Sequence, residues 1–413
     1  MSDKQAEFLR VVLVDEEFPY PINSGKRIRT LNLVKELAKK HRILYVAQAN
    51  QEPSELDSAK EYLNELGVET LEVPRAIPSK SGIGFYARLF VNLFSKMPYS
   101  VISHQNPKLH AALKKISQTK KVDIWHCEWT PYLEYFRRLD VKPVVVTAHN
   151  VESLIWKRYA ESETSIIKSW YIKKQWKKFE LFEKWAFHRA DKIVTVSEQD
   201  SSLAKIEFGA ASVGVVENGV DFEAFSSHGE PRLENSILFL GSLDWRPNLD
   251  GLQHFIRTSF SKVLKEYPEV TLKIVGRNAP SWLLSLGERD SHIEVHSNVP
   301  DAKPFLCEAT IMVVPLRIGG GSRLKIIEAA ANQLPVVTTK IGAEGLNFKH
   351  DEEYFYSEDI EHLHIPLIKA LSNAGSRKEV AKKAFEKASK EYGWDRLATV
   401  QDSIWRSVCS IKD

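Results

Sequence analysis

A glycine run followed by two cations is the part of this sequence best suited to binding a phosphate. The glycines 319–321 follow an apolar stretch that ends at Pro315, and a helical pattern begins directly after them. Glycine backbone can approach an anion closely, and the free amides and dipole of a helix N-terminus favour negative charge. We therefore predict a phosphate site in which a serine caps the helix and cations add charge. Its predicted contacts are Gly320, Gly321, Ser322, Arg323 and Lys325.

Glu328 follows Lys325 on the same predicted helix. Residues three apart share a helix face, so this carboxylate lies one turn deeper than the phosphate contacts, where ribose hydroxyls could be held. Small and apolar residues surround it, and a carboxylate buried among them is costly without a partner. An internal pair with Lys325 on a plain glycine-rich turn is the alternative interpretation. No Walker loop or dinucleotide fingerprint occurs at this place.

Polar residues that follow other strand-like runs are further candidates, because ligands of open α/β sheets bind at the carboxyl ends of the strands. His149 directly follows the run Val144 to Ala148 and could hydrogen-bond a sugar hydroxyl or stabilise partial charge. Glu128 and Glu152 could orient an acceptor. An ordinary partly buried histidine and two solvated surface carboxylates are the alternatives.

Short β-branched runs alternate with longer amphipathic segments, which predicts βαβ units around parallel sheets. The alternation stops at a polar stretch, 217–235, and then restarts. We therefore predict an α/β protein with two Rossmann-like domains facing each other across a cleft. The N-terminal domain is expected over residues 1–222 and the C-terminal domain over 223–385, with a helical segment, 386–413, packing back across both. Strands are predicted at Arg10–Asp15, Arg42–Ala47, Val122–His126, Pro143–Ala148, Lys192–Val196, Ser236–Leu240, Val270–Val275 and Thr310–Val314.

The composition indicates a globular protein without a general affinity for nucleic acid. The chain has 413 residues, of which 43% are hydrophobic, and its formal charge is only +3. Its three cysteines, Cys127, Cys307 and Cys409, fit neither a disulfide framework nor a zinc site, which favours a reducing compartment. No signal peptide or membrane-spanning stretch is recognisable. We expect a cytoplasmic protein.

Two aromatic and basic segments suggest contact with the inner face of a membrane. The helix-like stretch Ile166 to His188 mixes aromatic residues with lysines, which is typical of an interfacial helix. A core-facing aromatic stripe with a solvated lysine face is the favoured alternative. The segment Phe85 to Tyr99, with Arg88 and Lys96, adds modest support to the membrane interpretation.

Several motifs, in order along the chain, resemble those of the large retaining GT-B glycosyltransferase family GT4. The donor-binding segment of that family is similar to Gly319–Thr339, which contains Glu328-Ala329-Ala330. The other matching fragments are Phe18-Pro19-Tyr20-Pro21 through Gly25, Thr147-Ala148-His149-Asn150, Ala190 to Ser197, Glu217 to Asp221 and Phe239-Leu240-Gly241-Ser242-Leu243.

This resemblance implies sugar transfer from a UDP- or GDP-linked donor to a saccharide or lipid-linked acceptor of surface polysaccharide synthesis. It implies that Gly25 lets backbone pass near the donor, that His149 contacts the donor sugar, and that Val299 lies in the loop that binds the base. Retaining members are thought to pass the acceptor proton to the departing phosphate, so no protein base is needed. The sequence has no Asp-x-Asp, which argues against a metal-dependent transferase, and we expect no separate cofactor.

The sequence departs from the family pattern at two donor positions. Gly320 stands where many members have the first of two glutamates, and Ser242 follows Gly241 where others have an arginine. The nearest arginine is Arg246. The candidates for holding the diphosphate are therefore Lys325, Arg323 and Arg246, in that order.

The missing glutamate keeps a rival interpretation open, in which the chain binds nucleotide sugars as a scaffold without catalysis. A phosphorylase or epimerase on the same fold is a third interpretation. A dehydrogenase is the least favoured, because the first strand-to-helix turn contains only Gly25.

Overall fold

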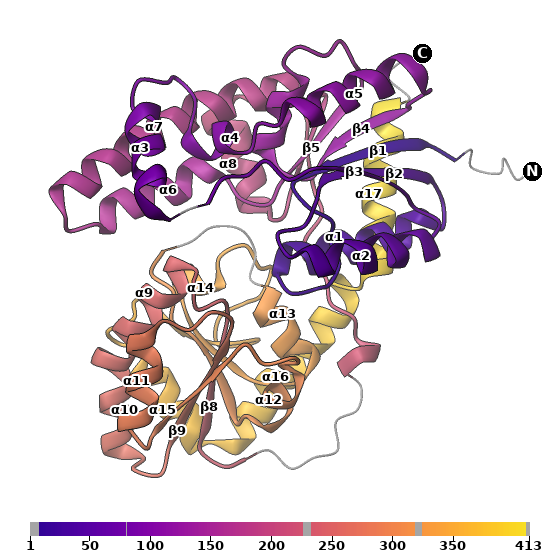
Figure 1. Ribbon diagram of the computed structural model, residues 1–413. Helices are drawn as coiled ribbons and strands as arrows, with labels where there is room; N and C mark the ends of the chain where they lie inside the picture. Colours follow the sequence, from indigo (N-terminus) through magenta and orange to yellow (C-terminus); the bar gives the residue numbers. More distant parts are fainter. Residues whose placement is uncertain (1–7, 80, 226–232, 319–323, 410–413) are drawn as a thin grey trace, which may run out of the picture. The chain divides into compact units, whose positions relative to one another are not determined.

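The computed structural model describes residues 8–79, 81–225, 233–318 and 324–409. The chain forms two compact units, of which unit 1 comprises residues 1–217 and 394–413, and unit 2 comprises residues 218–393. Each unit is a parallel sheet covered by helices (Figure 1).

Unit 1 contains a seven-stranded parallel sheet with the order β3-β2-β1-β4-β5-β6-β7. Its central strands are apolar on both faces, as expected for strands covered by helices on two sides, and Val11 to Val14 of β1 are at most 3% exposed. The chain order reverses between β1 and β4, which places the topological switch point at their carboxyl ends. The strands are β1 Arg10–Asp15, β2 Arg42–Gln48, β3 Glu69–Val73, β4 Ile124–Cys127, β5 Val144–Ala148, β6 Lys192–Thr195 and β7 Val213–Val215.

Helices cover both faces of this sheet and enclose two hydrophobic clusters. Helix α17 belongs to unit 1 although it comes from the C-terminal part of the chain, and it packs beside α1 (Figure 1). Its Trp405 is fully buried, and Trp405 Nε1 donates to His126 Nδ1 at 3.0 Å. The helices are α1 Gly25–Ala38, α2 Pro53–Glu65, α3 Gly82–Asn92, α4 Tyr99–Ser103, α5 Pro107–Thr119, a 3₁₀ segment Thr130–Phe136, α6 Glu152–Ser162, α7 Ile166–Arg189, α8 Glu198–Phe208 and α17 Trp394–Cys409.

Unit 2 repeats this architecture with a six-stranded parallel sheet in the order β10-β9-β8-β11-β12-β13. Its switch point lies between β8 and β11. The strands are β8 Ser236–Leu240, β9 Thr271–Gly276, β10 Ile293–Ser297, β11 Ile311–Val314, β12 Val336–Thr339 and β13 Phe355–Ser357. The helices are α9 Arg246–Phe255, α10 Ser261–Glu266, α11 Ser281–Arg289, α12 Lys303–Glu308, α13 Leu324–Ala331, α14 Lys340–Ala343, α15 His364–Ser372 and α16 Ala374–Glu391.

The observed boundaries differ from the predicted 222/223 and 385/386. The chain passes from unit 1 to unit 2 between residues 217 and 218, and it returns to unit 1 between residues 393 and 394. The two connecting segments are hydrogen-bonded to each other within unit 2. Val220 N donates to Tyr392 O at 2.8 Å, and Val220 forms an isolated β-bridge with Gly393. The C-terminal helical segment is therefore divided, because α16 stays in unit 2 while α17 completes unit 1.

Candidate functional site

In unit 2, a lysine and an asparagine approach a glycine at the end of β8. Lys325 Nζ donates to Asn248 Oδ1 at 3.2 Å and lies 5.2 Å from the centre of the Phe239 ring. A Cβ atom at Gly241 would lie 2.6 Å from Asn248 Nδ2 and 2.8 Å from Lys325 Nζ. Only glycine therefore lets both groups lie against the strand end. The structure thus brings the predicted residues Lys325 and Gly241 together at the switch point.

A second cation, which the sequence analysis missed, lies beside this group. Arg277 follows β9, and its Nη2 donates to Ser242 Oγ at 3.3 Å. Asn248 Nδ2 donates to the Ser242 carbonyl at 2.9 Å. The signal for Arg277 was present, because it lies two residues past the predicted strand Val270–Val275, near the carboxyl end of a strand as His149 is. Lys325, Arg277 and Ser242 together can bind an anion at the carboxyl edge of the sheet.

Glu328 lies on α13, three residues past Lys325. Burial raises the pKa of Glu328 to about 7, and the nearby cations Lys325 and Lys303 offset part of this rise. Among the residues that the structure describes, none donates a hydrogen bond to this carboxylate. The predicted internal pair with Lys325 is therefore only an electrostatic interaction, and the carboxylate can still accept hydrogen bonds from a ligand.

Two other predicted donor residues lie at the same edge of this sheet. Arg246 is the first residue of α9, two positions before Asn248, and is partly exposed. Val299 lies in the loop after β10 and packs against the apolar core of unit 2. The remaining predicted contacts, Gly320, Gly321, Ser322 and Arg323, lie outside the described residues.

In unit 1, Glu128 and His149 meet at the ends of β4 and β5. His149 Nε2 lies 3.5 Å from Glu128 Oε2, and His126 Nε2 lies 3.7 Å from Glu128 Oε1. Thr30 Oγ1 donates to Glu128 Oε2 at 3.4 Å. Glu128 is only 5% exposed, so its interpretation as a solvated surface carboxylate is wrong.

The charges of this pair follow from its surroundings. Burial alone would raise the pKa of Glu128, but the contact with His149 and the charges of His126 and Arg29 lower it to about 2. Burial lowers the pKa of His149. The pair is therefore an ionised carboxylate and a neutral imidazole whose Nε2 lies on the carboxylate side of the ring.

A lysine held by two carboxylates lies near the beginning of α1 and was not predicted. Lys26 Nζ lies 2.5 Å from Asp15 Oδ1 and 3.0 Å from Glu16 Oε1. Tyr45 OH also donates to Asp15, at 2.7 Å, and burial raises the pKa of Asp15 to about 6. Gly25, the predicted donor-facing glycine, is the exposed first residue of α1.

Glu152 is fixed by a tryptophan and by a second, fully buried carboxylate. Trp129 Nε1 donates to Glu152 Oε1 at 3.0 Å, and burial raises the pKa of Glu152. Glu183 accepts from the amides of Glu152 and Ser153 at 2.6 and 3.1 Å and so caps α6. Glu152 is therefore held in one orientation next to an aromatic ring, an arrangement that suits a sugar face and its hydroxyls.

Along most of its length, helix α7 packs its aromatic residues on the core and exposes its lysines, as the alternative to an interfacial helix predicted. Its buried apolar residues are Ile172, Phe179, Phe182, Ala186 and Phe187. Lys173, Lys174 and Lys177 are exposed on the opposite side.

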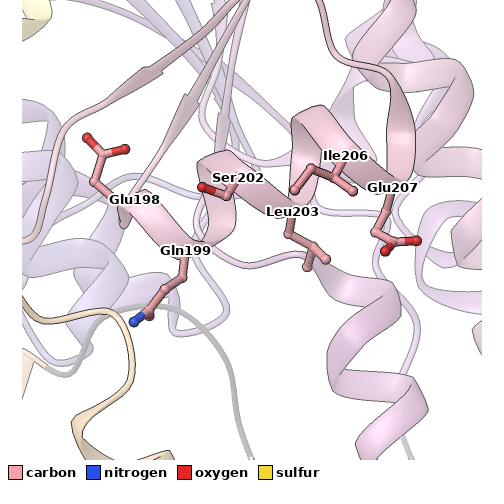
Figure 2. A pocket seen from close by; sticks show the side chains of 6 residues that line it. All are labelled: Glu198, Gln199, Ser202, Leu203, Ile206 and Glu207. Atoms are coloured by element: carbon pink, nitrogen blue, oxygen red, sulfur yellow. The ribbon is translucent and has the colours of Figure 1, made fainter.

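A surface hollow on α8 is not a candidate site. Its lining residues, Glu198, Gln199, Ser202, Leu203, Ile206 and Glu207, all come from one helix (Figure 2). They follow one another along the helix instead of converging on a common point, so they cannot surround a sugar nucleotide.

Comparison with known proteins identifies the family. Residues 24–224 match the family model described as Glycosyltransferase Family 4, and residues 234–373 match the model described as Glycosyl transferases group 1. A Klebsiella pneumoniae protein described as an uncharacterized 44.6 kDa protein in the cps region is 24% identical over 394 residues, which are 93% of this chain and 96% of that protein.

Solved structures share the fold. Sucrose-phosphate synthase from Thermosynechococcus elongatus aligns with a TM-score of 0.73 at 16% identity, over 98% of this chain and all of that one. Anabaena HepE in complex with UDP-glucose aligns with a TM-score of 0.65 at 11% identity, over 96% and 99% of the two chains. A variant of S. aureus TarM in complex with fondaparinux, alpha-GlcNAc-glycerol and UDP aligns with a TM-score of 0.70 at 11% identity, over 96% and 100%. Two successive family matches on two Rossmann-like units show that the chain belongs to the group 1, family 4 glycosyltransferases of the GT-B fold.

Proposed function

We propose that the protein moves a hexose, with retention and without a metal ion, from a UDP- or GDP-sugar to a saccharide or lipid-linked acceptor of surface polysaccharide synthesis. The cps-region relative and the UDP, UDP-glucose and saccharides named with the HepE and TarM structures support this proposal. We further propose that the reaction takes place in the cytoplasm.

The observation that carries the proposal is the placement of Lys325 against Gly241 with Glu328 one turn deeper on the same helix. A nucleoside diphosphate carries a dianionic diphosphate, and the ribose attached to it carries a diol. The Lys325 ammonium and the Arg277 guanidinium match the first, and the Glu328 carboxylate matches the second. The diphosphate and the ribose diol follow one another along the nucleotide, and the cations and the Glu328 carboxylate follow one another in the same order along the protein site.

The same cations would assist the chemical step. When the bond from the sugar C1 to the diphosphate oxygen breaks, negative charge builds on the diphosphate. Fixed positive groups stabilise that charge without a metal ion. We propose that Arg323, Arg246 and the amides of Gly320, Gly321 and Ser322 share this task, and that Gly241, Ser242 and Val299 shape the donor pocket.

We propose that unit 1 binds the acceptor and supplies His149 to the donor sugar. The ionised Glu128 fixes the ring of His149, so that its orientation does not depend on the substrate. Glu152 beside Trp129 orients the acceptor, and Gly25 keeps the start of α1 free of side chain near the donor. The acceptor proton passes to the departing phosphate oxygen, which requires no protein base.

The test is release of UDP or GDP from a panel of nucleotide sugars in the presence of cell-derived acceptors. We expect turnover with one donor, unchanged by EDTA, and a loss of roughly 10²- to 10³-fold in Lys325→Ala. Lys340→Ala is the control, because Lys340 is an exposed lysine of the same unit paired with Glu358. Binding of a nucleotide sugar without turnover would instead favour the scaffold interpretation, which the glycine at 320 motivates.

A further inference from the structure

Helix α3 turns its apolar side to solvent. Ile83, Tyr86, Phe90 and Phe94 are 90, 69, 63 and 81% exposed, and Val91 is 68% exposed. The spacing of these positions places them along one stripe of the helix and its continuation. Such a stripe ordinarily packs on the core. In α3 the one buried residue is instead the polar Asn92.

Polar contacts at its C-terminal end hold α3 in this orientation. Gln175 Nε2 donates to Asn92 Oδ1 at 2.8 Å, and Lys178 Nζ donates to the Asn92 carbonyl. Arg88 Nε donates to Tyr99 OH at 3.3 Å. The contacts of Asn92 tie the C-terminal end of α3 to the buried side of α7, and the contact of Arg88 ties the middle of α3 to α4. These hydrogen bonds therefore hold α3 with its apolar stripe facing solvent.

The beginning of α7 adds apolar and cationic side chains on its own solvent face. Ile166, Ile167 and Trp170 are 86, 80 and 51% exposed, and the exposed Lys173 and Lys174 follow on the same face. We call the exposed side chains of residues 83–96 and 166–174 the α3–α7 surface. The segments 82–97 and 166–174 that carry it contain no Asp or Glu, whereas they contain Arg88, Lys96 and the lysines 168, 173 and 174.

We propose that the α3–α7 surface docks on a bilayer whose surface carries anionic lipid headgroups. The aliphatic and aromatic side chains enter the boundary between headgroups and acyl chains, while the cations meet lipid phosphates. No helix in the described part of the chain is long and apolar enough to cross a bilayer, so the contact is peripheral. A second copy of this chain fits less well, because pairing two such surfaces would bring like charges together.

The test is co-sedimentation of the full chain with vesicles of phosphatidylcholine alone or with one third phosphatidylglycerol. We expect binding to the anionic vesicles that weakens with salt. The variant Ile83→Ser/Phe90→Ser/Phe94→Ser should lower the partition constant at least about tenfold. Lys173→Gln/Lys174→Gln should lower it about fivefold per lysine on anionic vesicles only. The matched control is Leu181→Ser/Ile206→Ser/Ile365→Ser, which removes apolar side chains of 70, 79 and 56% exposure elsewhere and should bind as the wild type does.

Equal vesicle binding by the wild type and the α3 triple variant would overturn the proposal. A wild-type dimer that the triple variant converts to a monomer, with vesicle binding unchanged, would show that the surface joins two copies and would also overturn it. The inference is separate from the proposed donor chemistry. The triple variant should bind UDP and melt as the wild type does, so loss of vesicle binding is distinguishable from loss of the donor site.

Discussion

Replacement of Glu328 by glutamine should weaken nucleotide binding and stabilise the ligand-free protein. The amide keeps the shape of the side chain but removes the charge. A hydrogen bond to a charged group contributes about 1.5–3 kcal/mol, so loss of the ribose contact should weaken UDP binding roughly 10- to 150-fold. Transfer should slow by a similar factor in kcat/KM.

The opposite effect on stability follows from the pKa of Glu328. Because burial raises this pKa from 4.5 to about 7, the folded state holds the proton more tightly than the unfolded state. The stability that this proton provides is fully present below pH 4.5 and is lost as the pH rises through 7. The shift corresponds to at most about 3 kcal/mol, which we reduce to about 1–2 kcal/mol because the side chain is partly exposed. At pH 8 Glu328→Gln should therefore melt higher than the wild type, and at pH 4.5 the two should coincide.

Titration calorimetry with UDP at pH 8 and thermal melts between pH 4.5 and 8 measure both effects on the same samples. Glu266→Gln, which changes an exposed carboxylate of unit 2, is the control and should change neither. A Glu328→Gln variant that melts much lower than the wild type while binding UDP normally would refute the reasoning. The carboxylate would then be structural, and the assignment of α13 to the donor would have to be withdrawn.

Two further substitutions test the geometry of the sheet ends. A Cβ atom at Gly276 would lie 1.9 Å from the Gly241 carbonyl oxygen, so Gly276→Ala should cost about 2–3 kcal/mol of stability and weaken UDP binding. The control is Gly375→Ala, which should do neither, because its Cβ would meet an ordinary contact of 3.4 Å. Glu128→Gln leaves Arg29, which is 1% exposed, without its ionised neighbour and should cost about 3–5 kcal/mol at pH 7 in denaturant titrations. Because the pKa of Glu128 is lowered from 4.5 to about 2, this difference should shrink as the pH falls from 4.5 through 2, and a deficit unchanged across that range would contradict the charge assignment.

Every central strand of the two sheets except β12 was predicted, because burial on two faces demands continuous apolar runs. The predicted bounds of β1 and β8 coincide with the observed ones. The four edge strands β3, β7, β10 and β13 were not predicted, and β3 and β10 contain glutamates such as Glu69 and Glu294. The central strand β12 was also not predicted. An edge strand is half exposed, and its sequence therefore resembles that of a loop or a helix.

The candidate site could be predicted only where one strand or one helix carries it. Lys325 and Glu328 share a helix, so their relation could be deduced from spacing alone. The contact of His149 with Glu128 depends on β4 and β5 being neighbours, and the pair Lys26–Asp15 depends on how α1 returns over the sheet. Such contacts arise from packing, which a linear pattern does not encode.

The position of α17 has a consequence for how the chain is synthesised. Trp405 fills the core of unit 1 and hydrogen-bonds to His126, which itself contacts Glu128. The ribosome, however, makes residues 218–393 before α17 appears. At typical translation rates this takes on the order of ten seconds or more. During that interval unit 2 can finish folding, while the part of the unit 1 core that α17 covers stays exposed, so the nascent unit 1 presents apolar surface to which a chaperone can bind.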